Sequence, residues 1–302
     1  MKLGTRGSRL ARWQAEWVQR ALSPHGVSAE IVVIKTRGDA EVDRPLHELE
    51  GKGFFTKEIE DALLAGGIDV AVHSLKDLPT RLPDGLALAA VPARHDPREA
   101  LVAKGVSSLL RLPPQARVGT SSLRRITQVR YLRPDLELVA LRGNVPTRVR
   151  KVEAGDGLDA ALLALAGLER LGLGGGGQAA AIDPLEVMPA PGQGALGLEI
   201  RAADRATRDA LQPLAHEESA SAVAAERAVL AALGGGCQAP VAAWVGMRDA
   251  GSGMRLYGRV TASDGSVQLT ASQDIEPDRP ERAGEAVARL LEAEGAASLL
   301  AR

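Results

Sequence analysis

The sequence contains one cysteine, Cys237, among 302 residues. A single cysteine excludes an internal disulfide and any zinc or iron–sulfur site built from several cysteines. We therefore expect a protein without disulfides and without a metal site.

Other absences narrow the class of protein further. Aromatic residues make up 2% of the chain, and the formal net charge is −1, so neither base stacking nor a global positive field favours nucleic acid. No apolar run is long enough for a membrane span, and the opening MKLGTRGSRLARWQAEWVQRAL lacks the apolar core of a secretory signal. We expect a cytoplasmic protein with no membrane or nucleic-acid partner.

What the sequence does contain is alternation of strand and helix patterns. AEIVVIKT (29–36) and IDVAVHS (68–74) predict strands, while 8–22 and FFTKEIEDALLAGG (54–67) predict helices. In the first helix we expect Leu10, Trp13, Trp17 and Leu22 to lie near one face. A second series follows, with strands at 136–143 and 159–167 and a helix at 145–155. Such alternation is typical of the α/β fold class.

Two segments predict crossings between domains. Prolines and charges interrupt VPARHDPREALVA (91–103) before the strand EALVA, and PAPGQGALGLEIR (189–201) ends in a strand that we expect to return to the first domain. Glycines 174–177 predict a flexible surface tip. After a helix ending near Gly234, three strands (239–247, 254–262 and 266–275) and one last helix (282–301) predict an α+β tail. The expected domains are 1–93 with 194–213, 94–193, and 214–302.

The polar stretch HSLKDLP (73–79) comes directly at the end of a predicted buried strand. Ligands in open α/β sheets bind beyond the carboxyl ends of strands, which places Lys76 and Asp77 where a site is expected. Taken alone, this stretch is better explained by an ordinary surface turn with a charge pair.

VGTSSLRR (118–125) and LRGNVPTRVRK (141–151) repeat this arrangement in the second series. Arg124 and Arg125 stand in the first turn of a helix, where positive charges are unfavourable unless an anion binds. From Arg117 to Lys151 there are nine basic and two acidic residues. A solvated basic face is the alternative, but placement at strand ends favours a pocket for a small polyanion. GTRGSRLA (4–11) adds Arg6 and Ser8, and we expect the two series to face each other across a cleft.

Cys237 lies in the glycine-rich stretch LGGGCQAP (233–240). A lone cysteine is usually an inert, small hydrophobic residue. Glycines let this backbone bend close to a ligand. Two functional roles for Cys237 therefore stay open, a nucleophile and a covalent anchor.

Taken together, these stretches resemble the porphobilinogen deaminase (hydroxymethylbilane synthase) family. The matching segments are GTRGSRLARWQ, KGFFTKEIEDALLAGGIDVAVHSLKDLPT, VGTSSLRR, LRGNVPTR, DAALLALAGLERLGL, PAPGQGALG and ERAVLAALGGGCQAP, in the family's order.

The resemblance implies two α/β domains like type II periplasmic binding proteins, plus a C-terminal α+β domain carrying the cysteine. It implies a transferase of porphyrin biosynthesis that condenses four porphobilinogen molecules head to tail, releasing ammonia, to give hydroxymethylbilane. The implied cofactor is a dipyrromethane attached through a thioether to Cys237, and the family precedent is a monomer.

The resemblance also implies roles for individual residues. Asp77 matches the catalytic aspartate, which stabilises the cationic azafulvene formed as ammonia leaves. Lys52 and Phe55 fall in a segment (37–55) that resembles the family's mobile lid. The residues that match cofactor and substrate contacts are Arg6, Ser8, Ser74, Lys76, Thr120, Ser122, Arg124, Arg125, Arg142, Arg148 and Arg170.

Ala239 and Val229 depart from the family's usual residues, and the departures concern packing near the cysteine loop. Two other functions fit parts of the pattern. A binding protein of the same architecture needs the arginines but neither Cys237 nor Asp77, and a ligand-sensing regulator needs a DNA-binding segment, which is not evident.

Overall fold

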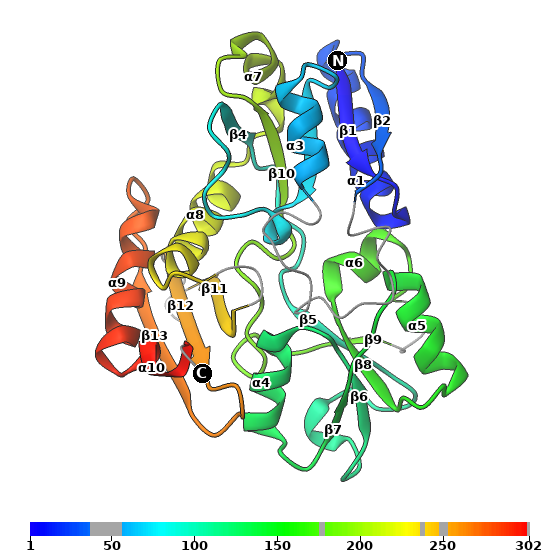
Figure 1. The fold of residues 1–302 in the computed structure, drawn as a ribbon, viewed down its shortest axis with the longest axis vertical. Coiled ribbons are helices and arrows are strands. Elements are labelled where there is room, and N and C mark those ends of the chain that lie inside the picture. Colours follow the sequence, from blue (N-terminus) through cyan, green and yellow to red (C-terminus); the bar gives the residue numbers. More distant parts are fainter. Residues whose placement is uncertain (37–55, 175–178, 236–238, 248–252, 301–302) are drawn as a thin grey trace. The chain divides into compact units, whose positions relative to one another are not determined.

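The computed structural model describes residues 1–36, 56–174, 179–235, 239–247 and 253–300. The chain divides into two compact units (Figure 1). The first contains Met1–His95 with Gly194–Ala220, and the second contains Asp96–Gln193 with Ser221–Arg302.

The first unit is built on a five-stranded sheet in the order β2-β1-β3-β10-β4. Its strands are β1 (Lys2–Arg6), β2 (Glu30–Ile34), β3 (Val70–Ser74), β4 (Leu86–Ala90) and β10 (Leu196–Arg201). Strands β2, β1 and β3 are parallel, and β10 runs antiparallel to both β3 and β4.

Two helices of this unit use alternate residues of the same strands. Helix α1 (Arg9–Leu22) packs with Val70 and Val72, while α3 (Lys57–Leu64) packs with Ala71. Because neighbouring strand residues point to opposite faces, the two helices cover opposite faces of the sheet. The short helix α7 (Arg205–Leu211) follows β10.

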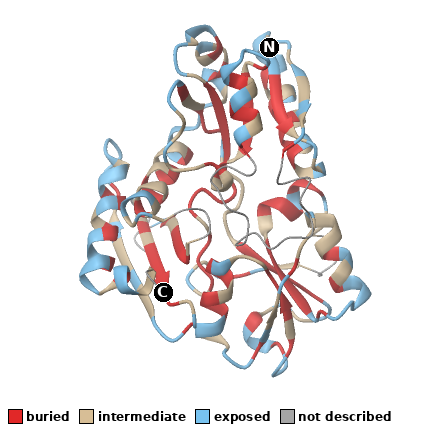
Figure 2. Cartoon of the chain, in the orientation of Figure 1, coloured by how far each residue is buried: buried red, intermediate tan, exposed pale blue. Residues whose placement is uncertain are grey.

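The second unit repeats this topology in the order β7-β6-β8-β5-β9. Strands β7 (Glu137–Val139), β6 (Arg117–Gly119) and β8 (Ala160–Ala164) are parallel, and β5 (Glu99–Ala103) runs antiparallel to β8 and β9 (Ala179–Ala181). Helix α4 (Leu123–Leu132) packs on one core, while α5 (Val145–Ala154) and α6 (Leu165–Arg170) pack on the other. Figure 2 shows the inner strands as largely buried, among them β3 and β10 in the first sheet and β5 and β8 in the second, whereas the edge strands β2, β7 and β9 are not.

The same unit ends in an antiparallel three-stranded sheet, β11-β12-β13. Its strands are β11 (Val241–Met247), β12 (Met254–Thr261) and β13 (Gln268–Asp274), and helices α8 (Glu217–Ala232), α9 (Pro280–Ala293) and α10 (Ala296–Leu300) complete this part. Val229 lies in its buried core and Ala239 packs against that core, so both departures from the family pattern are packing positions.

The predicted fold class is confirmed, because two α/β sheets of one topology and a C-terminal sheet with helices are present. The structure also adds strands β4 and β9, which are short and were not predicted. Among the described residues, no helix combines the length and hydrophobicity that a membrane crossing requires.

Two local features were not predicted. The buried face of α1 consists of Ala11, Gln14, Ala15, Val18 and Leu22, whereas both tryptophans are half-buried. Small side chains allow a helix to approach a sheet closely, and bulky residues then lie at its margins. The predicted last helix is two helices, because Gly295 adopts a left-handed conformation (φ 98°) between them.

Candidate active site

The first group of predicted site residues lies where β1 and β3 end. These neighbouring strands are parallel, so their carboxyl ends lie at the same edge of the sheet. A small pocket of about 70 Å³ opens there. Its lining residues are Arg6, Ser8, Leu10, Ala11, Gln14, Thr56, Val72, His73, Ser74 and Asp77. Four of the predicted residues are therefore brought together around one cavity.

Local structure explains where these side chains lie. Ser8 is the N-cap of α1, and its hydroxyl accepts a hydrogen bond from the backbone N–H of Ala11 at 3.3 Å. Lys76 and Asp77 belong to a 3-10 turn, Leu75–Asp77, that begins directly after β3. Both side chains are half-buried, and the buried Leu75 anchors the turn.

Sequence reasoning missed Gln14, which lines the same pocket. Its Nε2 donates to Oγ of Ser74 at 2.9 Å, and Ser74 Oγ lies 3.2 Å from Gln14 Oε1. The side chain is buried on α1, between Ala11 and Ala15. The available signal was a glutamine at an apolar position of an amphipathic helix.

Two buried acidic side chains near the pocket were also missed, Glu199 on β10 and Glu60 on α3. His73 Nε2 lies 3.1 Å from Oε2 of Glu199, a fully buried residue on β10. Burial raises the pKa of Glu60, on α3, and the charge of Glu199 raises it further. Among the described residues, no group of three His, Cys, Asp or Glu side chains is arranged to hold a metal ion.

The second group lies where β6, β7 and β8 end in the other unit. These three parallel strands are neighbours, so their carboxyl ends share an edge. Thr120 and Ser122 follow β6, and Ser122 N–H donates to Thr120 Oγ1 at 3.3 Å. Arg142 and Arg148 follow β7, and Arg170 follows β8 at the end of α6.

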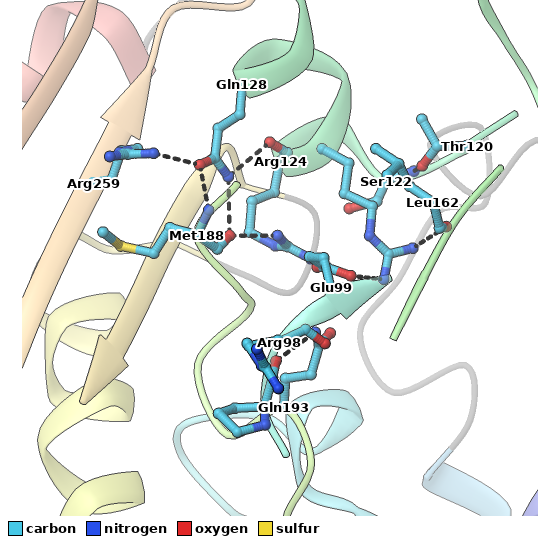
Figure 3. A network of polar contacts seen from close by, with 12 residues as sticks. Arg98, Glu99, Thr120, Ser122, Arg124, Gln128, Leu162, Met188, Gln193 and Arg259 are labelled. Carbon is cyan, nitrogen blue, oxygen red and sulfur yellow. Dashed lines mark hydrogen bonds and ion pairs between the residues drawn. The ribbon is translucent and has the colours of Figure 1, made fainter. Parts of the chain in front are cut away.

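Arg124 and Arg125 are held by one carboxylate (Figure 3). Glu99 accepts from Arg124 Nη2 at 2.6 Å and from Arg125 Nη2 at 2.7 Å. Arg124 also donates to Met188 O and Arg125 to Leu162 O. All three side chains are buried, and burial lowers the pKa of Arg124. The two guanidinium groups and the one carboxylate together carry a net charge of +1.

The other arginines of this edge are held differently. Arg142 and Arg148 are half-buried, and Arg148 Nε donates to the carbonyl of Gly143, whose φ of 108° permits the tight turn before α5. Asn144 caps α5 through Thr147 N–H at 3.0 Å. Arg170 is 7% exposed, and burial lowers its pKa to about 10, so it stays charged at neutral pH.

Three predicted site residues lie outside the described residues. They are Cys237, Lys52 and Phe55, together with the predicted lid (37–55) and most of the predicted glycine tip (174–177).

Comparison with known proteins decides the family. Residues 1–209 match the sequence model "Porphobilinogen deaminase, dipyromethane cofactor binding domain", and residues 220–293 match "Porphobilinogen deaminase, C-terminal domain". The chain belongs to the porphobilinogen deaminase family. It is thus a transferase of tetrapyrrole biosynthesis, in a family that condenses porphobilinogen units into hydroxymethylbilane and uses a dipyrromethane cofactor.

Individual relatives match over nearly their whole length. The porphobilinogen deaminase of Moorella thermoacetica is 49% identical over 99% of this chain and 95% of its own. That of Geobacter metallireducens is 46% identical over 100% of this chain and 94% of its own. The resemblance stated from the sequence motifs is confirmed.

Two solved structures show a more distant similarity. The methionine binding protein MetQ has a TM-score of 0.43 at 14% identity, covering 74% of this chain and 94% of its own. A periplasmic substrate-binding protein of an ABC transporter from Coxiella burnetii has a TM-score of 0.44 at 14% identity, covering 75% of this chain and 96% of its own.

Each strand edge, taken by itself, offers groups that suit a dipyrromethane, which carries carboxylate side chains and pyrrole N–H groups. In the first unit, Arg6, Ser8 and Ser74 supply donors and Asp77 an acceptor around one pocket. In the second, Thr120 and Ser122 lie beside a helix N-terminus, and Arg142 and Arg148 lie at the next strand end.

Proposed function

We propose that this chain joins four porphobilinogen molecules head to tail, releasing ammonia, with Asp77 as the catalytic residue and Cys237 as the cofactor tether. The observation that supports this most strongly is the pocket at the ends of β1 and β3, because Arg6, Ser8, Ser74 and Asp77 all line this one cavity. The family match over nearly the whole chain supports the same reaction.

Asp77 suits a reaction in which positive charge develops beside pyrrole N–H groups. Its carboxylate accepts hydrogen bonds from those N–H groups and stabilises the cationic carbon that forms when ammonia leaves porphobilinogen. The same oxygen atoms can take up and return the proton that each condensation moves. The 3-10 turn Leu75–Asp77 fixes the carboxylate at the strand end, so little reorganisation is required.

The arginines suit the carboxylates of the substrate. Each porphobilinogen brings two carboxylates, and a guanidinium can bind a carboxylate through two parallel hydrogen bonds. Arg142, Arg148 and Arg170 bind these groups along the β7 and β8 ends, and Arg6 does so in the first unit. Arg124 and Arg125 contribute the net positive charge that remains after Glu99 is counted.

When bound through a thioether to Cys237, the dipyrromethane supplies the pyrrole carbon to which the first porphobilinogen is joined. The residues that would donate to its polar groups are Ser74, Lys76, Thr120 and Ser122. We also propose Lys52 and Phe55 as substrate contacts, on the family resemblance of the segment 37–55.

We extend the proposal to the organisation of the chain. The protein is a cytoplasmic monomer with porphobilinogen as its only partner. Its domains are 1–93 with 194–213, 94–193, and 214–302, of which the last carries the tether.

Replacing Asp77 by asparagine tests the proposal. Asp77→Asn keeps the size of the side chain and removes the charge, so we expect formation of hydroxymethylbilane to fall at least about a hundredfold with unchanged unfolding. Asp84→Asn, at an exposed position shortly after the turn, is the matched control and should keep full activity. Normal turnover in Asp77→Asn would show that another group performs the chemistry.

A further inference from the structure

Arg259, on β12, is a buried cation held by neutral acceptors. Its side chain donates to four groups: Thr270 Oγ1 at 3.1 Å, Gln128 Oε1 at 3.0 Å, Glu186 O at 3.3 Å and Leu185 O at 2.9 Å. It is 6% exposed, and no carboxylate among the described residues forms an ion pair with it. Burial lowers its pKa to about 10, so it remains protonated at neutral pH.

A buried charge without a counter-ion is costly, and its retention requires a compensating contact. Two of its acceptors belong to a tight turn, residues 183–188, in which Asp183 O accepts from the N–H groups of Glu186 and Val187. The carbonyls at the end of such a turn lack partners of their own, and Arg259 supplies donors to two of them.

The third acceptor, Gln128, connects Arg259 to α4 (Figure 3). Gln128 Oε1 also accepts from Met188 N–H at 2.8 Å, and Gln128 Nε2 donates to Met188 O at 3.0 Å and Arg124 O at 3.2 Å. Arg124 then donates to the same Met188 carbonyl at 2.6 Å and to Glu99. A continuous series of hydrogen bonds therefore runs from β12 through Gln128 to the Arg124–Glu99–Arg125 cluster.

A second contact attaches α4 to the same sheet. Arg130 Nη1 donates to Ser263 O at 3.1 Å, in the turn between β12 and β13. Gly265 of that turn, with φ of 77°, lies so close to Arg130 and Tyr131 that an added Cβ would meet their backbone. Two contacts, at Gln128 and at Arg130, thus fix the position of α4 along the sheet.

The sheet that α4 contacts begins four residues after Cys237. Strand β11 starts at Val241, and Ala242 is paired with Arg259 in the β11–β12 register. Arg259 is therefore linked, through one strand pairing, to β11, the first strand after the cysteine in the sequence.

We propose that Arg259 is a positioning residue, which holds the Arg124–Arg125 pair in register with the sheet that carries the Cys237 segment. This inference rests on the proposed roles of Cys237 and the two arginines. The net positive charge of this pair must keep its place relative to the β11–β12 sheet, and a displacement of about 1 Å can reduce the rate of a positioned reaction about a hundredfold. Arg259 holds the pair in this place and takes no part in the substrate and cofactor contacts proposed above.

The test uses full-length apoprotein and follows its gain of mass with porphobilinogen. Arg259→Met and Gln128→Met each remove the hydrogen bonds at similar side-chain length. Arg255→Met is the matched control, because Arg255 is on the same strand, half-exposed, and bonded only to Ser272 and Asp274 among the described residues.

We expect loading to slow at least about tenfold in Arg259→Met and Gln128→Met, with no change in Arg255→Met. The double variant should load no more slowly than the slower single variant, because both break one series of contacts. Arg259→Lys, which keeps the charge, should recover part of the rate. In loaded enzyme kcat should fall as well, because the displaced Arg124–Arg125 pair slows each positioned condensation step.

Loading of Arg259→Met at the wild-type rate, even with lowered stability, would overturn the proposal and leave Arg259 a packing residue. If Arg259→Met does not fold, Arg259→Lys and Gln128→Met decide by the same rates.

If the wild-type chain gains no mass, or Cys237→Ala gains it too, the proposed tether is wrong. Hydrogen exchange of the α4 amides then decides: faster exchange in Gln128→Met and Arg259→Lys than in Arg255→Met supports the positioning role, and equal exchange overturns it.

Discussion

Glu99 Oε1 accepts a hydrogen bond from Arg124 Nη2 at 2.6 Å, and both residues are buried, with neither more than 6% exposed. The same carboxylate binds Arg125, so one buried acid compensates two buried cations. The first turn of α4 would otherwise place two positive charges at the positive end of the helix dipole, inside the protein.

Glu99→Gln should therefore destabilise the protein strongly. The amide keeps the shape but leaves two buried guanidinium groups without a counter-charge, which costs about 3–5 kcal/mol. Urea unfolding of the apoprotein measures this loss, with Glu153→Gln on the exposed side of α5 as the control. Equal unfolding free energies for the two variants would show that Glu99 is not the compensating charge.

Gln14→Leu should lower activity more than stability. The substitution removes both hydrogen bonds to Ser74 and places an apolar side chain in the pocket that contains Asp77. A loss of about 1.4 kcal/mol of transition-state binding corresponds to a tenfold lower kcat/KM. Gln19→Leu is the control, since Gln19 is on the same helix and donates instead to Ala29 O. Unchanged kcat/KM in Gln14→Leu would remove this pocket from the substrate site.

Glu60→Gln should stabilise the protein more at high pH than at low pH. Burial raises the pKa of Glu60 above 4.5, so the folded state binds this proton more tightly than the unfolded state. The resulting stability is fully present below pH 4.5 and is lost as the pH rises through the raised pKa. Glu60→Gln has no carboxyl group to ionise, so its stability does not fall for this reason as the pH rises.

Urea unfolding at about pH 4 and about pH 8 gives the difference between Glu60→Gln and the wild type. The difference should move in favour of the variant at the higher pH. Glu292→Gln, an exposed position on α9, provides the reference. A difference that is the same at both pH values would contradict a raised pKa for Glu60.

Gly284→Ala should destabilise the C-terminal part of the chain. An added Cβ at Gly284, on α9, would meet the Ala225 carbonyl and the Ala228 Cβ of α8. Backbone at such a contact cannot yield without moving a helix, and overpacking of this kind costs about 1–3 kcal/mol. Gly174→Ala, where an added Cβ makes only an ordinary contact, is the control, and thermal unfolding measures both.

The sequence predicted the fold class because periodicity and strand-end chemistry are local. Strand β5 was predicted at its observed bounds, Glu99–Ala103, since EALVA is a short apolar run bounded by prolines and charges. The pocket residue Asp77 was predicted because it follows such a run, whereas Ser74, the last residue of β3, was predicted only from the family resemblance. The single helix predicted at 282–301 was wrong, because whether Gly295 breaks a helix depends on its φ, which the sequence does not give.

The partners of the site residues could not be predicted in the same way. Glu99 is 25 residues from Arg124, and Glu199 is 126 residues from His73, so sheet topology alone brings each pair together. Gln14 occupies an apolar position on a helix, where periodicity assigns it to neither the core nor the site. Arg259 lies in a predicted strand whose neighbours in space belong to another part of the chain.

The most direct test of the account is the intact mass of the purified chain, compared with the 31.6 kDa of the polypeptide and with a Cys237→Ala variant. The account predicts an excess equal to two porphobilinogen molecules less two ammonia molecules in the wild type, present on purification or gained on incubation with porphobilinogen, and absent from Cys237→Ala. A wild-type chain that keeps its bare mass after that incubation, or a Cys237→Ala variant that carries the same excess, would contradict it.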